Sequence, residues 1–247
     1  MGEIGYNRDF PEIGNLTADS NIVVLSGAGV SQESGINTFR DHGGLWEEHD
    51  VNEVATPQAW NNVRELVLRF YNERRKQLLR VEPNEAHRYL AELGKHFNTH
   101  IITQNIDDLH ERAGSLNVLH LHGELKKVRS TVDENLLYEL PGWELKSGDR
   151  CEKGSQLRPH VVWFGEMVPM IAPASELVKS ADFIIVVGTS LNVYPAAGLL
   201  YDVARGVPIV VIDPSEMNLS SYSNVLHIRE KASVAVKNLV LKMLANL

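Results

Sequence analysis

Two glycines that follow a short apolar stretch could form a nucleotide-binding turn. Residues 22–25 read Ile-Val-Val-Leu, and Ser26-Gly27-Ala28-Gly29 comes directly after them. Glycines at the end of a strand let backbone N–H groups approach a phosphate, because no Cβ intervenes. The third glycine of the usual dinucleotide fingerprint is replaced by Gln32, and the next glycine is Gly35. The glycine pair alone is therefore also compatible with an ordinary tight turn.

The segment after these glycines contains residues suited to covering a bound ligand. It reads Thr-Phe-Arg-Asp at 38–41 and Gly-Gly-Leu-Trp at 43–46. Phe39 can lie over the ligand, and Arg40 can pair with a phosphate.

Two histidines lie at the end of another apolar stretch. A strand is predicted over 118–121, followed by His122 and Gly123. Strand alternation places His120 and His122 on the same side. An isolated histidine is usually structural, but one at the carboxyl end of a strand is better placed for proton transfer. Its unperturbed pKa, about 6.5, lies near working pH.

The predicted strands alternate with helical patterns along the chain. Five strands end in polar or glycine-rich residues, at Ser26-Gly27, Gln104-Asn105, His122-Gly123, Gly188-Thr189-Ser190 and Asp213. This alternation predicts an α/β fold with a parallel sheet and helices on both faces. Ligands bind such sheets outside the carboxyl ends of the strands, so we expect the five ends to line one crevice.

A long helix predicted over 60–79 carries two polar residues on its apolar stripe. The stripe comprises Val63, Leu66, Val67, Phe70 and Leu78. Tyr71 and Arg74 continue it. A charged residue on a buried face is either neutralised by a partner or lines a cleft. Alternatively, both residues lie at the edge of the stripe and reach water. Arg75 lies about 100° further round the helix and is predicted to lie off the stripe.

Composition narrows the class of protein. The chain has 247 residues and a formal net charge of −8, which argues against nucleic acid as the main partner. The single cysteine, Cys151, allows no intramolecular disulfide and fits a cytoplasmic location. No apolar run is long enough to span a membrane, and the N-terminus has no apolar signal core.

Six motifs together resemble the signatures of sirtuins, the NAD-dependent protein-lysine deacylases. They are GAGVS, TFRD, TQNID, HLHG, VVWFGE and GTSLNVYPAA. The resemblance extends from about residue 23 to 214. It implies a Rossmann-like, doubly wound parallel sheet with a smaller inserted helical and irregular module. The NAD-binding domain would comprise residues 1–40, 83–123 and 158–247, and the small domain residues 41–82 and 124–157.

The resemblance also implies roles for individual residues. His122 would be the general base, with Asn105 and Asp107 also catalytic. The NAD-binding residues would be Gly27, Ala28, Gly29, Ser31, Glu33, Thr38, Phe39, Arg40, Trp46, Gln104, Asn105, Ile106, Asp107, Gly188, Thr189, Ser190 and Asp213. The substrate peptide would pair with the segment of Val161, Val162, Trp163 and Phe164. Asp213 stands where sirtuins often have asparagine, and it can accept hydrogen bonds from a ribose diol.

The implied reaction transfers the acyl group to ADP-ribose. The acyl oxygen attacks C1′ of the nicotinamide ribose, nicotinamide leaves, and His122 deprotonates the ribose hydroxyls. The 2′-oxygen then attacks the imidate carbon, and water completes the release of free lysine and O-acyl-ADP-ribose. The implied partners are acyl-lysine proteins, with no nucleic acid or membrane.

Two departures from the family pattern affect the prediction. Most sirtuins hold a structural zinc on two C-x-x-C pairs, and this chain has Ser130, Asp133, Cys151 and Gly154 at those positions. One thiolate cannot form a tetrahedral structural site, so zinc is not expected. We expect packing through Leu136, Leu137 and Trp143 to hold the module instead.

The second departure concerns the acyl group. Tyr71 and Arg74 resemble the Tyr-x-x-Arg pair of class III sirtuins, which act on succinyl-lysine and related acidic groups. This predicts removal of succinyl and malonyl groups, with some activity on acetyl-lysine.

Three alternatives remain at this point. A Rossmann dehydrogenase would reduce NAD, but the glycine spacing and the QNID motif argue against it. An NAD hydrolase or ADP-ribosyltransferase would release nicotinamide without an acyl-lysine substrate. A non-catalytic NAD or ADP-ribose sensor is disfavoured by His122 together with Asn105 and Asp107.

Overall fold

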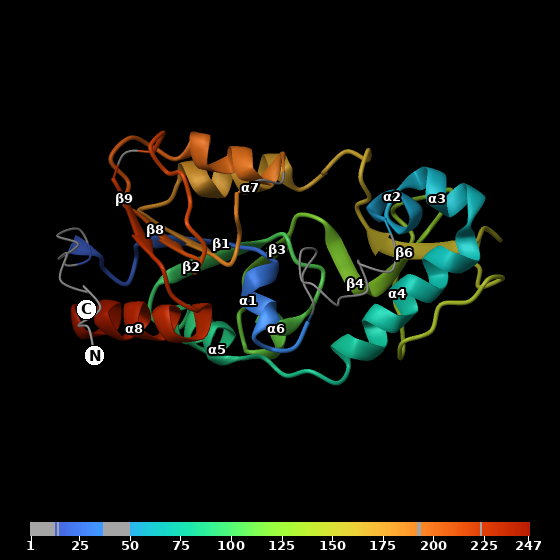
Figure 1. The fold of residues 1–247 in the computed structure, drawn as a ribbon, viewed down its shortest axis with the longest axis horizontal. Coiled ribbons are helices and arrows are strands. Elements are labelled where there is room, and N and C mark those ends of the chain that lie inside the picture. Colours follow the sequence, from blue (N-terminus) through green and yellow to red (C-terminus); the bar gives the residue numbers. More distant parts are fainter. Residues whose placement is uncertain (1–12, 14, 37–49, 192–193, 223) are drawn as a thin grey trace.

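A six-stranded parallel sheet is the larger of two sheets in the computed structural model (Figure 1). The structure describes residues 13, 15–36, 50–191, 194–222 and 224–247. The strands of this sheet are β1 (Asn21–Ser26), β2 (Asn98–Thr103), β3 (Val118–His120), β7 (Phe183–Val187), β8 (Ile209–Ile212) and β9 (Val225–Ile228). Their order is β3-β2-β1-β7-β8-β9, and every pairing is parallel. This is the Rossmann order, which confirms the predicted fold class. β9 was not predicted.

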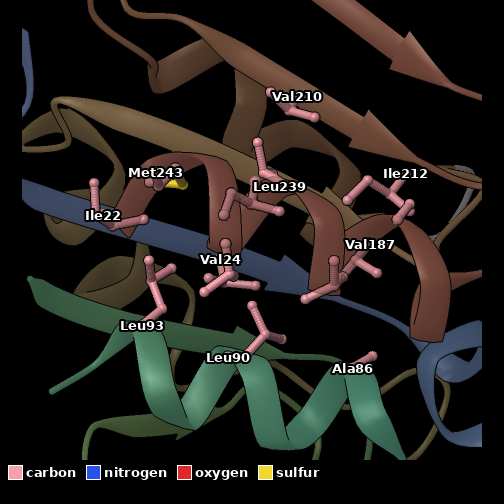
Figure 2. Packing of buried hydrophobic residues seen from close by; sticks show 14 of the residues in the cluster. Ile22, Val24, Ala86, Leu90, Leu93, Val187, Val210, Ile212, Leu239 and Met243 are labelled. Carbon is pink, nitrogen blue, oxygen red and sulfur yellow. The ribbon is translucent and has the colours of Figure 1, made fainter. Parts of the chain in front are cut away.

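Helices cover both faces of this sheet, as the sequence predicted. Helices α5 (Glu85–Leu93) and α8 (Ala232–Ala245) cover one face, and Figure 2 shows Ile22 and Val24 of β1 packed among their apolar side chains. Helix α7 (Ile171–Lys179), which was not predicted, and the 3₁₀ helix η2 (Ala196–Asp202) cover the other face. The Tyr194-Pro195 pair, where the sequence predicts the start of a helix, directly precedes η2.

A second, three-stranded sheet contradicts the prediction of an irregular module over 124–157. Strands β4 (Gly123–Ser130), β5 (Leu137–Glu139) and β6 (Leu157–Val161) pair antiparallel in the order β5-β4-β6. The register of β4 against β6 shifts between Gly123 and Val128. This irregularity interrupts the apolar–polar alternation of β4, so its sequence shows no clear period. The predicted domain boundaries stay a prediction, and β6 pairs within this smaller sheet.

Three helices pack on the second sheet, at the right of Figure 1. They are α2 (Val51–Val54), α3 (Pro57–Asn62) and α4 (Arg64–Leu78). The single helix predicted over 60–79 is broken at Val63, whose backbone leaves the helical region at φ −137° and ψ 45°. Val63 is 43% exposed and does not belong to the buried stripe.

The core of this smaller module differs in part from the expected packing. Leu137 is 41% exposed, so it does not hold the module, whereas Leu145 is 1% exposed. Leu145 packs with Leu125 and Val128 of β4 and with Trp163. Within the described part of the chain, no helix is both long and apolar enough to cross a membrane.

Candidate active site

The glycine loop after β1 packs against the loop after β7, where the strand order reverses. The N–H of Gly27 donates to Val187 O at 3.0 Å, and that of Gly29 donates to Gly188 O at 2.8 Å. A Cβ on Gly29 would lie 2.8 Å from the Cα of Gly188. Glycine is therefore required by contact between the two loops. The N–H groups of Gly27 and Gly29 are thus used within the protein and are not free to bind a phosphate.

The Gln104-Asn105 pair connects three of the predicted strand ends. Gln104 donates from Nε2 to the hydroxyl of Thr189 at 3.1 Å, and its backbone N–H donates to Ser26 O at 2.9 Å. Asn105 donates from Nδ2 to Gly27 O at 3.1 Å and to the hydroxyl of Ser31 at 3.0 Å. The structure thus brings together residues that the sequence predicted to share one site.

Asp107 is a buried carboxyl group beside the same network. It is 6% exposed and precedes helix α6 (Leu109–Arg112), whose Leu109 N–H donates to its Oδ1 at 3.2 Å. Burial raises the pKa of Asp107, while hydrogen bonds from the Ser31 hydroxyl and the Leu109 N–H oppose that rise. Ile106, its neighbour, accepts a bond from Leu125 N–H at 2.7 Å and so connects the loop to β4.

The two histidines of the HLHG motif differ in how their ring nitrogens are used. His122 donates from Nδ1 to Gln104 O at 2.9 Å, which leaves Nε2 for proton transfer. His120 donates from Nδ1 to Asn105 O at 2.9 Å, and its Nε2 lies 2.7 Å from Oε1 of Glu111. The structure therefore favours His122 as the base and makes His120 a link between Glu111 and the Gln104-Asn105 loop.

The same surroundings shift the pKa values of the two rings in opposite directions. Burial lowers the pKa of His122, and the bond to Gln104 O offsets this only in part. Burial also disfavours the charged form of His120. The hydrogen bond and negative charge of Glu111 outweigh that effect, so the pKa of His120 is raised.

The predicted peptide-binding segment lies next to the candidate base. The N–H of Val162 donates to His122 O at 2.9 Å, and the N–H of Phe164 donates to Ala55 O at 3.0 Å. β6 ends at Val161, so Val162, Trp163 and Phe164 of the predicted segment lie beyond the strand. Phe164 is 49% exposed, whereas Trp163 is 2% exposed.

Tyr71 and Arg74 both point into the protein from α4. Tyr71 is 2% exposed and Arg74 is 9% exposed, so the alternative that both reach water is wrong. Burial lowers the pKa of Arg74, and the charges of Tyr71 and Asp107 counteract it.

Arg75, which is predicted to lie off the stripe, is also buried. It is 1% exposed. Its guanidinium donates to Leu125 O at 2.8 Å, to Oδ1 of Asn72 at 2.6 Å and to Trp143 O at 3.2 Å. All three acceptors are neutral. The bonds to Leu125 O and Trp143 O join α4 to β4 and to the loop after β5. The helix is buried on more than one side because the smaller module surrounds it, and Arg75 has a structural role.

The other predicted site residues lie in several places. Ala28 begins the short helix α1 (Ala28–Gln32), and Ser190 lies in the loop after β7. Asp213 follows β8 and accepts from Ser215 N–H at 2.9 Å. Glu33 accepts from the backbone and hydroxyl of Ser233, at 3.0 and 2.5 Å, near the start of α8. Thr38, Phe39, Arg40 and Trp46 lie outside the described residues.

Sequence reasoning missed an ion pair that supports the predicted peptide-binding segment. Arg158 pairs with both carboxylate oxygens of Glu166, at 2.6 and 3.1 Å, and donates to Val161 O at 3.0 Å. The presence of Arg and Glu at the two ends of RPHVVWFGE was the available signal. A second buried contact, between His110 Nε2 and the Ser26 hydroxyl at 2.9 Å, gave no signal in the sequence.

The positions aligned with zinc ligands do not fit that metal. They offer one thiol, one hydroxyl, one carboxylate and a glycine without a side chain, whereas a structural zinc site takes four Cys or His ligands. The Ser130 hydroxyl lies 2.9 Å from that of Ser155 and 3.4 Å from Sγ of Cys151. These hydroxyls lower the pKa of the Cys151 thiol to about 7. Asp133 pairs with Lys153 at 2.6 Å.

Comparison with known proteins gave consistent matches. The model of the Sir2 family matches residues 27–195. The chain is 54% identical to an NAD-dependent protein deacylase of Helicobacter pylori over 226 residues, covering 91% of this chain and 97% of that protein. It is 52% identical to an NAD-dependent protein deacylase of Bacteroides thetaiotaomicron over 224 residues, covering 89% of this chain and 96% of that protein.

Two solved structures extend the comparison to bound ligands. The fold matches that of a Sir2 homologue in complex with NAD with a TM-score of 0.87 and 41% identity, covering 99% of this chain and 97% of the other. It also matches a Sir2 protein bound to a deacetylated p53 peptide and 3′-O-acetyl ADP-ribose, with a TM-score of 0.79 and 29% identity. That match covers 95% of this chain and 97% of the other.

Proposed function

This chain belongs to the Sir2 family and is an NAD-dependent protein deacylase, and we propose that it removes succinyl and malonyl groups as well as acetyl groups from lysine. Its substrates are acyl-lysine proteins. The choice of acyl group rests on Tyr71 and Arg74 and on their resemblance to the Tyr-x-x-Arg pair of class III sirtuins.

The residues at the carboxyl ends of the strands fit NAD. Gln104 contacts Thr189 directly, and Asp213 offers a carboxylate at the end of β8 that suits a ribose diol. We assign Gln104, Asn105 and Asp107 to the nicotinamide end and the residues after β7 and β8 to the adenosine end. When bound, NAD supplies the ADP-ribose that accepts the acyl group, with nicotinamide as the leaving group.

The assignment of His122 as general base is supported by its hydrogen bonding. Its Nδ1–H is held by Gln104 O, so the neutral ring presents Nε2 as a proton acceptor. Burial lowers its pKa, which keeps the ring neutral at working pH. The bond from Val162 N–H to His122 O connects this residue to the segment proposed to pair with the substrate peptide.

One observation carries the proposed acyl preference, namely the burial of Arg74 on the same side of α4 as Tyr71. A guanidinium that is 9% exposed has lost most of its hydration, and an acidic acyl group would provide a carboxylate to pair with it. Tyr71, one helical turn earlier, provides a hydroxyl on the same side of α4. An acetyl group has no carboxylate that could make these contacts.

The proposal also covers zinc, nucleic acid, and the location of the protein. We propose that no structural zinc holds the smaller module, because of the residue types at the four ligand positions. The net charge of −8 supports a protein partner over nucleic acid. A cytoplasmic location and the absence of a membrane partner stay predictions from the sequence.

Mass spectrometry of matched peptides tests the proposal. Peptides that differ only in an acetyl, succinyl or malonyl group on one lysine are incubated with the protein, with and without NAD. We expect NAD-dependent release of all three groups, with kcat/KM highest for the acidic ones. Release of acetyl alone would overturn the acyl preference, and nicotinamide release without any acyl-lysine would favour an NAD hydrolase.

A further inference from the structure

The hydroxyl of Tyr71 accepts a hydrogen bond from the indole of Trp163. The distance from Nε1 to the hydroxyl oxygen is 2.9 Å, and both side chains are 2% exposed. The indole N–H can only donate, so the phenol must be the acceptor. A phenol has one proton and can still donate it while accepting such a bond. Burial raises the pKa of Tyr71 to about 12, so the hydroxyl keeps that proton at working pH.

The indole of Trp163 is itself held on two sides. The guanidinium carbon of Arg158 lies 3.4 Å from its ring centroid, and the ring of Trp60 lies 5.7 Å away. Glu166 fixes Arg158 by two hydrogen bonds and accepts the backbone N–H of Trp163 at 2.8 Å. The direction of the indole N–H is therefore set by the segment around it and not by Tyr71.

We propose that Trp163 is a positioning residue that directs the Tyr71 hydroxyl toward the carboxylate of an acidic acyl group. This inference rests on the proposed function, in which Arg74 supplies the matching charge. With one lone pair occupied by the indole N–H, the phenol oxygen is fixed and its O–H is directed away from Trp163. The acyl carboxylate then meets a donor whose orientation is already set.

The position of Trp163 in the chain supports this role. It lies between Val162, whose N–H is bonded to His122 O, and Phe164, whose N–H is bonded to Ala55 O. The bond to Tyr71 spans 92 residues of sequence and joins this segment to α4. The segment proposed to bind the peptide is thereby connected to the residues proposed to select the acyl group.

A double-mutant cycle on Trp163 and Tyr71 tests the inference. Trp163→Phe removes the N–H, Tyr71→Phe removes the hydroxyl, and the double variant lacks both. For each, kcat and KM are measured on one peptide with succinyl-, butyryl- or acetyl-lysine. Butyryl has similar length but no charge. We expect Trp163→Phe to lower the succinyl-to-acetyl ratio of kcat/KM by about 2- to 12-fold, the value of one hydrogen bond, mainly through KM.

Two controls separate positioning from packing. In the Tyr71→Phe background, Trp163→Phe should cause no further fall in the succinyl-to-acetyl ratio, because the hydroxyl that it positions is absent. Trp60→Phe makes the same change in the adjoining ring and should leave that ratio at the wild-type value. In these variants the butyryl-to-acetyl ratio of kcat/KM should not fall together with the succinyl-to-acetyl ratio, because butyryl has no carboxylate.

A second variant keeps the test decisive if Trp163→Phe does not fold. Benzothienylalanine at position 163 replaces the indole N–H by sulfur and keeps the bicyclic shape, and it should lower the ratio as the phenylalanine does. The positioning role is overturned if Tyr71→Phe lowers the succinyl-to-acetyl ratio but the change at position 163 does not. It is also overturned if the change at position 163 lowers that ratio equally in the wild-type and Tyr71→Phe backgrounds. If the wild-type protein shows no preference for succinyl over butyryl, the proposed function itself fails.

Discussion

The Nδ1 atom of His122 lies 2.9 Å from the carbonyl oxygen of Gln104. This single bond fixes the tautomer of the ring and the direction of Nε2. It also connects the candidate base to a residue whose side chain contacts Thr189 on the far side of the reversal point. The geometry of the base therefore depends on the loop proposed to bind nicotinamide.

Replacing the base tests its assignment. His122→Ala should lower kcat by about 10²–10⁴-fold, the usual cost of losing a general base. The ring is only partly buried, so the fold should persist, as circular dichroism would report. NAD affinity, measured by calorimetry, should also be retained. Turnover close to wild type would remove His122 from the mechanism.

The pH dependence of kcat/KM should reflect the lowered pKa of His122. The neutral ring is the active form, so activity should rise as pH increases through the pKa and then level off. Burial lowers that pKa from the ordinary value of 6.5, so the midpoint of the acidic limb should lie below pH 6.5. A midpoint above that value in the wild-type protein would contradict the described environment of the ring.

The contact between His120 and Glu111 should stabilise the fold over a limited pH range. The raised pKa of His120 contributes stability below the unfolded value of 6.5, which is lost as pH rises through the folded pKa. The lowered pKa of Glu111 contributes stability above 4.5, which is lost as pH falls through the folded pKa. Glu111→Gln should therefore lower Tm more at pH 5.5 than at pH 8.5. An equal loss at both values would show that the contact is not ionic.

The sequence predicted the sheet well because its signals were local. The buried strands β1, β7 and β8 are continuous apolar runs, and helix α5 has Asn84 at its N-cap and Gly94 at its C-cap, both residues typical of helix ends. β9 was missed because its four residues are only partly buried and include a histidine, so the apolar run is short. The second sheet was missed because the register shift in β4 obscures the alternation.

The sequence predicted which residues belong to the candidate site, but it predicted only some of the contacts that position them. Motif spacing identified Gly27 and Gly29, but nothing local indicated that Gly188 would lie against them. The burial of Arg75 could not be foreseen because it depends on Leu125 and Trp143, which are distant in sequence. The separate functions of His120 and His122 were likewise set by Glu111, on another element.

A hydroxyl cluster should stabilise the smaller module in place of metal. Ser130 is 3% exposed, and its hydroxyl accepts from the N–H groups of Val132 and Asp133, both at 3.2 Å. Ser130→Ala should cost roughly 1–3 kcal/mol of unfolding free energy, because these groups lose a buried partner. A chelator should leave the Tm of the wild-type protein unchanged. One equivalent of zinc by elemental analysis, lost together with the folded state on chelation, would contradict this.

The adjacent arginines of α4 provide a matched pair for testing acyl selection. Arg75→Met removes bonds to Leu125, Asn72 and Trp143, so it should lower Tm while leaving the succinyl-to-acetyl ratio of kcat/KM at its wild-type value. It serves as the control for a buried arginine that does not face the acyl group.

The succinyl-to-acetyl ratio of kcat/KM in Arg74→Met tests the central claim most directly. A charge-assisted hydrogen bond contributes about 1.5–3 kcal/mol, so we expect the ratio to fall by roughly 10- to 150-fold, mainly through a higher KM for the succinyl peptide. Deacetylation should be retained. If Arg74→Met instead lowers both activities by the same factor, Arg74 is structural, and the proposed preference for acidic acyl groups is wrong.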